Sequence, residues 1–238
     1  MGVVYDFGNP PESGFRRPDL YAAVLEQVTW LDSLNLDLVW FTEHHFVDDG
    51  YLPSWIPVAS AMAARTRHVR FSCDVCLLPF NHPIRLAEDL AVLDNISGGR
   101  VAIGIGLGYA VHEFRGFGLP VSHRLSYTDE GLEVLTRDFP PIREAERRRM
   151  ALYNQFRAES GGHGGVAGIT EEQRIPQGWI VGTLDECVAR MAAFITEYGL
   201  TDVVCWAVPP GMRPDQMNRH LERYARELVP RLKAMFPG

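Results

Sequence analysis

The sequence predicts an α/β fold in which parallel strands alternate with helices. Short runs of almost continuous apolar residues, such as 37–42 and 100–105, are typical of strands that helices cover on both faces. Stretches with apolar residues at helical spacing lie between these runs. Clusters of Gly, Pro, Asn and Asp separate the two kinds of segment.

The first half of the chain repeats this strand and helix pattern. The expected strands are Gly2–Asp6, Asp37–Thr42, Val69–Leu78 and Arg100–Ile105. The expected helices are 20–34 with Asp19 as N-cap, Ser54–Ala64, and Pro83–Ile96, which the run Ser97-Gly98-Gly99 ends.

The second half is richer in helices. Those expected are Asp129–Arg137, an Arg-rich helix at Pro141–Ala158, one from the cap Thr183 to Tyr198, and Pro214–Phe236. Glu186 would complete a capping box with Thr183, and Gly199 would end that helix. One more strand is expected at Asp202–Val208, and the Gly-rich stretch Ser160–Gly168 should form no regular element. Five strands are therefore expected, whereas a closed (β/α) barrel needs eight.

Composition narrows the class of protein. The formal net charge of −7 argues against nucleic acid as a partner. No apolar run is long enough for a transmembrane helix, and the start of the chain does not resemble a signal peptide, so a cytoplasmic protein is expected. Cys73 and Cys76 are spaced like a metal or redox pair, but residues three apart on a strand point to opposite faces, which favours buried thiols.

Function in parallel α/β folds depends on the loops that follow the strands. Asp6, after the first strand, either accepts a hydrogen bond from a ligand or forms the turn there. Glu43, His44 and His45 follow the second strand, and histidine exchanges protons readily near neutral pH. This cluster is interpreted as a ligand or proton-transfer site, with a metal site and a structural role as alternatives.

Two further loops hold candidate residues. His82 precedes Pro83, so it either faces the pocket or caps the following helix. Asp74 lies in an apolar run and is expected to be buried, with a hydrogen-bond partner or a strained backbone to explain it. The glycines of Gly104–Tyr109 either let the backbone approach a ligand closely or serve for turning.

Several of these segments together resemble the bacterial-luciferase-like flavin monooxygenases and oxidoreductases. The segments that carry the resemblance are Leu38–Phe46, Leu78–Arg100, Gly104–Tyr109, Phe114–Gly118, Val181–Cys187 and Val229–Leu232. Members of that family are TIM barrels that bind reduced FMN or a related deazaflavin coenzyme. The FMN members oxidise a substrate, and the deazaflavin members transfer hydride.

The resemblance also implies roles for individual residues. His44 matches the position implicated in proton transfer near the flavin, and His45 and Glu43 would line the same pocket. Asp74-Val75 matches a cis peptide bond behind the flavin ring. The stretch Gly106, Leu107, Gly108 and Tyr109 matches the loop near the flavin's ribityl-phosphate tail.

The chain departs from the family pattern at the phosphate. Leu107 stands where the luciferase has an arginine that holds the phosphate, and the family's fifth strand with its phosphate loop is not found. About a hundred residues, strands five to seven, are missing between Thr136 and Ile169 by this comparison. The expectation is one incomplete, TIM-barrel-like domain over 1–238, in which segment 138–168 replaces those strands.

The expected function is that of a flavin-dependent oxidoreductase acting on a small organic substrate with reduced FMN, or with the deazaflavin coenzyme. A flavin reductase would supply the reduced flavin, and a homodimer is expected. Two alternatives follow from the missing phosphate site: a flavin-binding relative without turnover, and a degenerate, truncated member of the family. A metal hydrolase that uses His44 or His45 is a further alternative.

Overall fold

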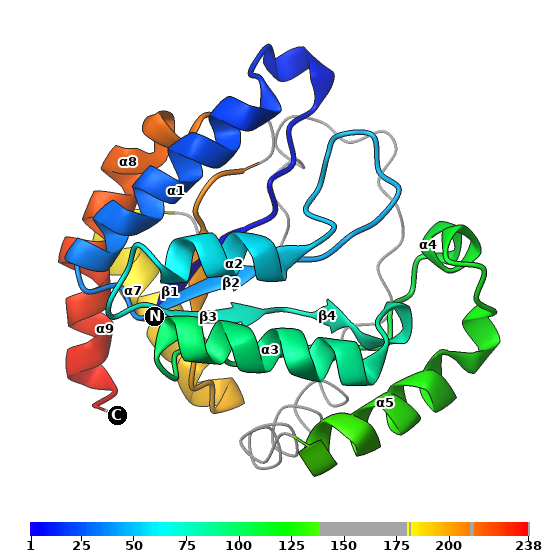
Figure 1. Cartoon of the computed structure of the whole chain (residues 1–238). Helices are drawn as coiled ribbons and strands as arrows, with labels where there is room; N and C mark the ends of the chain where they lie inside the picture. The colour runs from blue at the N-terminus through cyan, green and yellow to red at the C-terminus, as the bar shows by residue number, and fades with distance from the viewer. Residues whose placement is uncertain (139–179, 181, 210–211, 238) are drawn as a thin grey trace, which may run out of the picture.

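A computed structural model of the chain describes residues 1–138, 180, 182–209 and 212–237 (Figure 1). The strands are β1 (Gly2–Tyr5), β2 (Leu38–Phe41), β3 (Arg70–Cys73), β4 (Cys76–Leu77), β5 (Ile105–Gly106) and β6 (Val204–Trp206). The α-helices are α1 (Arg17–Ser33), α2 (Trp55–Ala63), α3 (Pro83–Ser97), α4 (Val111–Gly116), α5 (Arg124–Asp138), α7 (Leu184–Tyr198), α8 (Pro214–Arg223) and α9 (Val229–Met235).

The strands form a parallel sheet in the order β3-β2-β1-β6, and β4 and β5 form a second parallel pair. A single bridge between Phe71 and Val101 joins β3 to the chain that leads into β5. The architecture is the TIM-barrel-like α/β fold, and among the described residues the sheet does not close into a barrel. The prediction of an incomplete (β/α) fold is confirmed.

The strand predictions are right in position and differ in detail. The run Val69–Leu78 is interrupted at Asp74 and Val75, which separate β3 from β4. The run Arg100–Ile105 pairs at Val101, and its regular strand begins only at Ile105.

Two helix predictions need correction. Asp19 does not cap α1, because the helix begins at Arg17 and Asp19 lies in its first turn, paired with Arg16. Helix α5 begins at Arg124, five residues before the expected start at Asp129. Helix α4 was not expected. The final helix is continuous, with a π-helical turn at Tyr224–Leu228 between α8 and α9.

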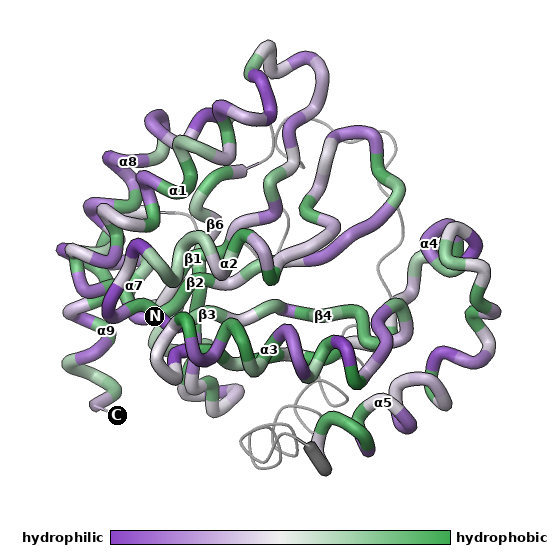
Figure 2. The backbone as a smooth tube through the Cα atoms, viewed as in Figure 1, coloured by the Kyte–Doolittle hydropathy of each residue, from purple (hydrophilic) through white to green (hydrophobic). Residues whose placement is uncertain are grey.

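The strands at the centre of the molecule consist mainly of hydrophobic residues (Figure 2), and their side chains belong to the buried core. Val3, Val39 and Phe71 occupy β1, β2 and β3 and are fully buried. Gly2 lets β1 approach β2, because a Cβ atom there would lie 2.2 Å from the carbonyl oxygen of Leu38. Burial of this kind is the main favourable contribution to folding.

The order of the chain places the candidate loops together. Both termini lie on one side of the molecule in Figure 1, where α9 ends, and the loop between β2 and α2 and helix α4 lie on the other side. That second side contains the carboxyl ends of the parallel strands, where function is expected. None of the helices in the described part of the chain is long and apolar enough to cross a membrane.

Some predictions lie outside the described residues. These are the helix 141–158, the Gly-rich stretch 160–168 and most of the piece 179–182. The replacement of strands five to seven by segment 138–168 is untested for the same reason.

Candidate active site

A buried carboxylate on α4 organises the loop that carries the two histidines. Glu113 Oε1 lies 2.9 Å from His44 Nδ1 and accepts a hydrogen bond of 2.8 Å from the backbone N–H of His45. Glu113 itself is only 1% exposed. One oxygen therefore sets the position of the His44 ring and of the adjacent backbone.

The environment of Glu113 favours its charged form. Burial raises the pKa of this carboxyl, but the hydrogen bonds from His44 and from the His45 backbone outweigh burial and leave the pKa below its usual value. A charged Glu113 can orient His44 and stabilise a positive charge on its ring. That is the arrangement expected of a histidine that moves protons.

His45 is held by a second buried carboxylate. Its Nε2 lies 2.9 Å from Glu43 Oε1, and Glu43 Oε2 accepts a bond of 3.3 Å from the backbone N–H of Leu77 in β4. The rings of Phe80 and Phe117 pack edge-on against His45, with centroids 5.7 and 4.9 Å away. The His45 side chain is 14% exposed and that of His44 is 28% exposed, so His44 has the better access to a ligand.

Two tyrosine rings lie next to the His44 ring. Its centroid is 4.9 Å from that of Tyr51 and 6.0 Å from that of Tyr109, both edge-on. On the Tyr51 side is a pocket of about 250 Å³, lined by Arg17, Tyr21, His44, Phe46, Val47, Gly50, Tyr51 and Pro53. Tyr109 does not line this pocket, and its side chain is mostly exposed.

The ends of β3 and β5 lie beside this loop. A cis peptide bond joins Asp74 and Val75, as the resemblance implied. Gly106 packs against Val75, since a Cβ atom on Gly106 would lie 2.2 Å from Val75 Cγ2. The expectation that Asp74 is buried is wrong, because Asp74 is exposed and its backbone N–H bonds to the carbonyl oxygen of Phe41 at 2.7 Å.

Asp6 has the turn-forming role that was one of the two considered for it in the sequence, and the ligand-binding role stays a prediction. Its Oδ1 accepts a 2.9 Å hydrogen bond from the backbone N–H of Gly8, which is the turn-forming role. Its Oδ2 is buried and has no partner among the described residues. Burial raises the pKa of Asp6 to about 6, and the nearby charge of Asp49 adds to the rise.

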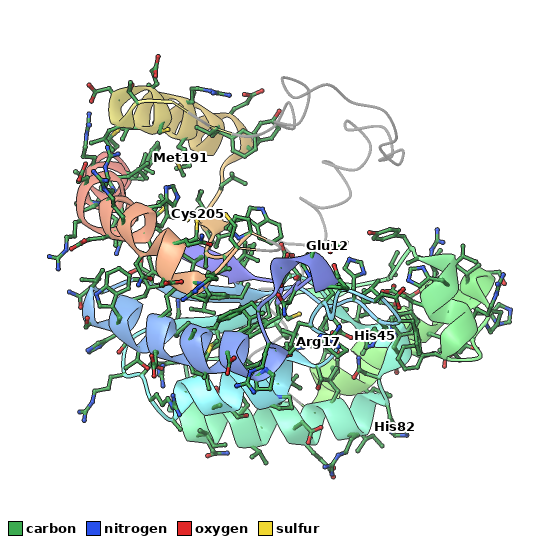
Figure 3. All side chains as sticks on the ribbon, turned by 90° about the horizontal axis from the view of Figure 1, so that it is seen from above. Glu12, Arg17, His45, His82, Met191 and Cys205 are labelled. Atoms are coloured by element: carbon green, nitrogen blue, oxygen red, sulfur yellow. The ribbon has the colours of Figure 1, made fainter. Side chains whose placement is uncertain are left out.

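Other candidate residues lie apart from this cluster or are only partly in it. His82 is exposed at the N-cap position of α3, makes no side-chain cap bond, and lies away from His45 in Figure 3. Of the glycine loop, Leu107 and Gly108 are partly buried, and Gly108 has a positive φ of 70° and packs beside Phe114 and Phe80.

Sequence reasoning missed Glu113 and Tyr51. Glu113 lies between the glycine loop and Phe114. A carboxylate directly before the segment Phe114–Gly118, which carries part of the family resemblance, was the signal that could have identified it as a site residue.

No group of three His, Cys, Asp or Glu in the described residues is placed to hold a metal ion. Cys73 and Cys76 are buried free thiols, and burial raises the pKa of both well above its usual value.

The chain is similar in sequence to known proteins. Residues 1–146 match the family model described as luciferase-like monooxygenase. A 4-hydroxyprotoasukamycin monooxygenase from Streptomyces nodosus subsp. asukaensis is 32% identical over 113 residues, which are 48% of this chain and 30% of that protein. The chain thus spans about a third of the length of the relatives that it matches in sequence.

Two solved structures share the fold. A monooxygenase from Streptomyces bottropensis superposes with a TM-score of 0.70 at 21% identity, over 96% of this chain and 98% of that one. The oxygenating constituent of 3,6-diketocamphane monooxygenase from Pseudomonas putida, in complex with FMN, has a TM-score of 0.52 at 21% identity, over 58% of this chain and 39% of that one. Because the family model matches well over half of the residues, this chain belongs to the luciferase-like monooxygenase family.

Proposed function

We propose that this chain is the oxygenating component of a flavin-dependent monooxygenase, which uses reduced FMN to oxidise a small organic substrate. The observation that carries the proposal is the contact of 2.9 Å between His44 Nδ1 and the buried carboxylate of Glu113. It holds a proton-exchanging side chain at the carboxyl end of the strands, beside the cis peptide bond Asp74-Val75.

The chain's own residues would share the work as follows. Glu113 orients the His44 ring and stabilises its protonated form, so that His44 exchanges a proton with the bound flavin or substrate. Glu43 holds His45, whose aromatic neighbours Phe80 and Phe117 exclude water from that side of the site. The cofactor, when bound, supplies the oxidising chemistry through its reaction with oxygen.

The residues fit the flat ring of a flavin better than its phosphate. The absence of a side chain at Gly106 makes room for Val75, which follows the cis peptide bond, and the ring of Tyr109 in the same glycine loop is exposed near His44. The stretch Gly106–Tyr109 contains no cationic side chain, and Leu107 offers the phosphate neither charge nor hydrogen bond. The proposal therefore places the ring at Gly106 and Val75 and predicts a weak hold on the phosphate.

Three parts of the proposal go beyond the family membership. FMN is favoured over the deazaflavin coenzyme because a structural neighbour of the same fold contains FMN. A separate flavin reductase is proposed because that neighbour is described as an oxygenating constituent. A homodimer is proposed because α3 exposes three apolar side chains, Ile84, Val92 and Ile96, and light scattering of the purified chain tests it.

Titration of the purified chain with oxidised and reduced FMN, and with both forms of the deazaflavin coenzyme, tests the proposal by fluorescence. Micromolar binding of reduced FMN supports it, and tighter binding of the deazaflavin coenzyme contradicts the choice of cofactor. Binding without substrate oxidation in the presence of a flavin reductase would favour the alternative of a flavin-binding relative without turnover. No binding of any form would contradict the proposal.

The Leu107→Arg variant sharpens this test. A charge-assisted contact to the phosphate contributes about 1.5–3 kcal/mol, so the variant should bind FMN roughly ten-fold or more tightly than the natural chain. Riboflavin lacks the phosphate and serves as the control ligand, for which the two proteins should not differ. Equal affinity for FMN would mean that the phosphate does not lie at Leu107.

A further inference from the structure

The pocket beside His44 has the size and lining of a small-molecule site. Its volume of about 250 Å³ is just below the range typical of drug-sized ligands, which suits a compact molecule of one or two rings. Aromatic side chains supply much of the wall, from Tyr21, His44, Phe46 and Tyr51. Flat rings pack well against such walls, edge-on or offset.

The lining carries one cationic side chain and no carboxylate. Arg17 begins α1, and the loop after β2 supplies most of the rest of the lining (Figure 3). Among the described residues, Arg17 has no acidic partner, whereas the neighbouring Arg16 makes bonds of 2.7 and 2.6 Å to Asp19. An unpaired guanidinium at the mouth of an aromatic pocket can bind a carboxylate with two parallel hydrogen bonds.

Arg17 is also held in place. Its Nη2 donates a 2.8 Å hydrogen bond to the carbonyl oxygen of Asp48. The guanidinium lies over Gly50, where a Cβ atom would come within 2.6 Å of Arg17 Nε. Gly50 has a positive φ of 75°, so its conformation and its missing side chain both support this packing. Ordering the guanidinium in advance lowers the entropy lost when a ligand binds.

We propose that this pocket binds the substrate of the enzyme, that the substrate is an aromatic carboxylic acid, and that Arg17 pairs with its carboxylate. The assignment as the substrate site rests on the proposed function, because His44, the proposed proton-transfer residue, lines this pocket. The preference for an aromatic acid does not depend on flavin and is tested separately.

Calorimetric titration of the full chain with 2-naphthoate and with its neutral counterpart 2-naphthamide tests the preference. The acid should bind at least ten-fold more tightly than the amide. Arg17→Met keeps an unbranched apolar stem and removes the charged guanidinium, so this variant should bind both probes alike. Arg16→Met is the matched control, and it should keep the preference because Arg16 is paired outside the pocket.

Equal binding of acid and amide by the natural chain would overturn the proposal, as would failure of both to bind or a preference that survives in a folded Arg17→Met variant. Thermal melting of each variant shows whether it is folded. If Arg17→Met does not fold, raised salt replaces it, and the acid alone should then lose affinity.

A titration with FMN in the presence of saturating 2-naphthoate separates the two proposals. Simultaneous binding supports two adjacent sites, and competition would overturn the assignment of this pocket to the substrate. Loss of all flavin binding with the acid preference intact would defeat the proposed function and leave an acid-binding pocket without its role as a substrate site.

Discussion

Two regions at the same end of the sheet each bury one carboxylate, and the pKa of the two carboxyl groups shifts in opposite directions. In the region formed by α4 and the loop after β2, Glu113 accepts bonds from His44 and from the His45 backbone, and its pKa lies below the usual value. In the loop after β1, Asp6 is equally buried, and its pKa rises to about 6. Each of the two carboxylates has one buried oxygen without a hydrogen-bond partner among the described residues, so the contrast lies in the donors to the other oxygen.

The difference shows that burial alone does not decide the charge of a carboxyl group. Both groups are 1% exposed, so removal from water acts on both in the same direction. The hydrogen bonds from His44 and from the His45 backbone reverse the effect at Glu113, whereas the backbone N–H groups of Gly8 and of Asp6 itself do not outweigh burial at Asp6. The first region is therefore built to hold a charge, and the second is not.

The largest expected effect is the loss of turnover when His44 of the first region is replaced. His44→Ala should lower turnover about 10²- to 10⁴-fold, because general acid–base catalysis contributes that much. Folding should persist, since the His44 side chain is 28% exposed. Product formation with reduced FMN measures the loss, and His112→Ala, at an exposed position next to Glu113, is the control. Unchanged turnover in His44→Ala would remove the proton-transfer role.

The second region is tested by Asp6→Asn, which keeps an oxygen for the Gly8 N–H. The folded-state pKa of Asp6 lies above its unfolded value of 3.8, so the natural chain should lose stability as pH rises from about 4 through 6. A pKa shift of this size corresponds to a change of about 2–3 kcal/mol in the free energy of unfolding of the natural chain. The Asn variant cannot titrate at this position, so its stability should not fall over the same pH range. Chemical denaturation at pH 4 and pH 7 measures the difference. Asp48→Asn, at an exposed position, should match the natural chain at both pH values.

The smallest of these effects is expected for Glu113→Gln, which removes the charge and keeps the shape. Because the folded-state pKa of Glu113 is lowered, its contribution to stability is present above its unfolded pKa and is lost as pH falls through the folded value. The variant should be about 1–2 kcal/mol less stable at pH 7, and the two proteins should converge in acid. A constant difference across the pH range would mean that the charge of Glu113 does not act on folding.

Local signals in the sequence were enough to predict where some of the helices begin and end. Thr183 and Glu186 form the expected capping box of α7, and Gly199 ends the helix with a φ of 60°. These features depend only on residues within one or two turns. The start of α1 was misjudged because Asp19 is a good N-cap type, but Pro18 is equally suited to the first turn and the helix begins three residues earlier than expected.

Contacts between distant residues were beyond the sequence alone. The burial of Asp74 was inferred from its place in an apolar run that was taken as one strand, and the structure interrupts that run between β3 and β4. His44 and Glu113 are 69 residues apart, and no spacing rule connects them. Their pairing required α4 to fold beside the loop after β2.

The sequence by itself determined the order of strands and helices, the family, and the loops in which the chemistry lies, because these follow from short-range periodicity, capping and motif spacing. Only the tertiary structure decided that Glu113 holds His44, that Asp6 keeps an unpartnered oxygen, and that Arg17 lies at an aromatic pocket. The physical reason is that a side chain's charge and its freedom to bind a ligand depend on which atoms fold against it, and those atoms come from distant parts of the chain.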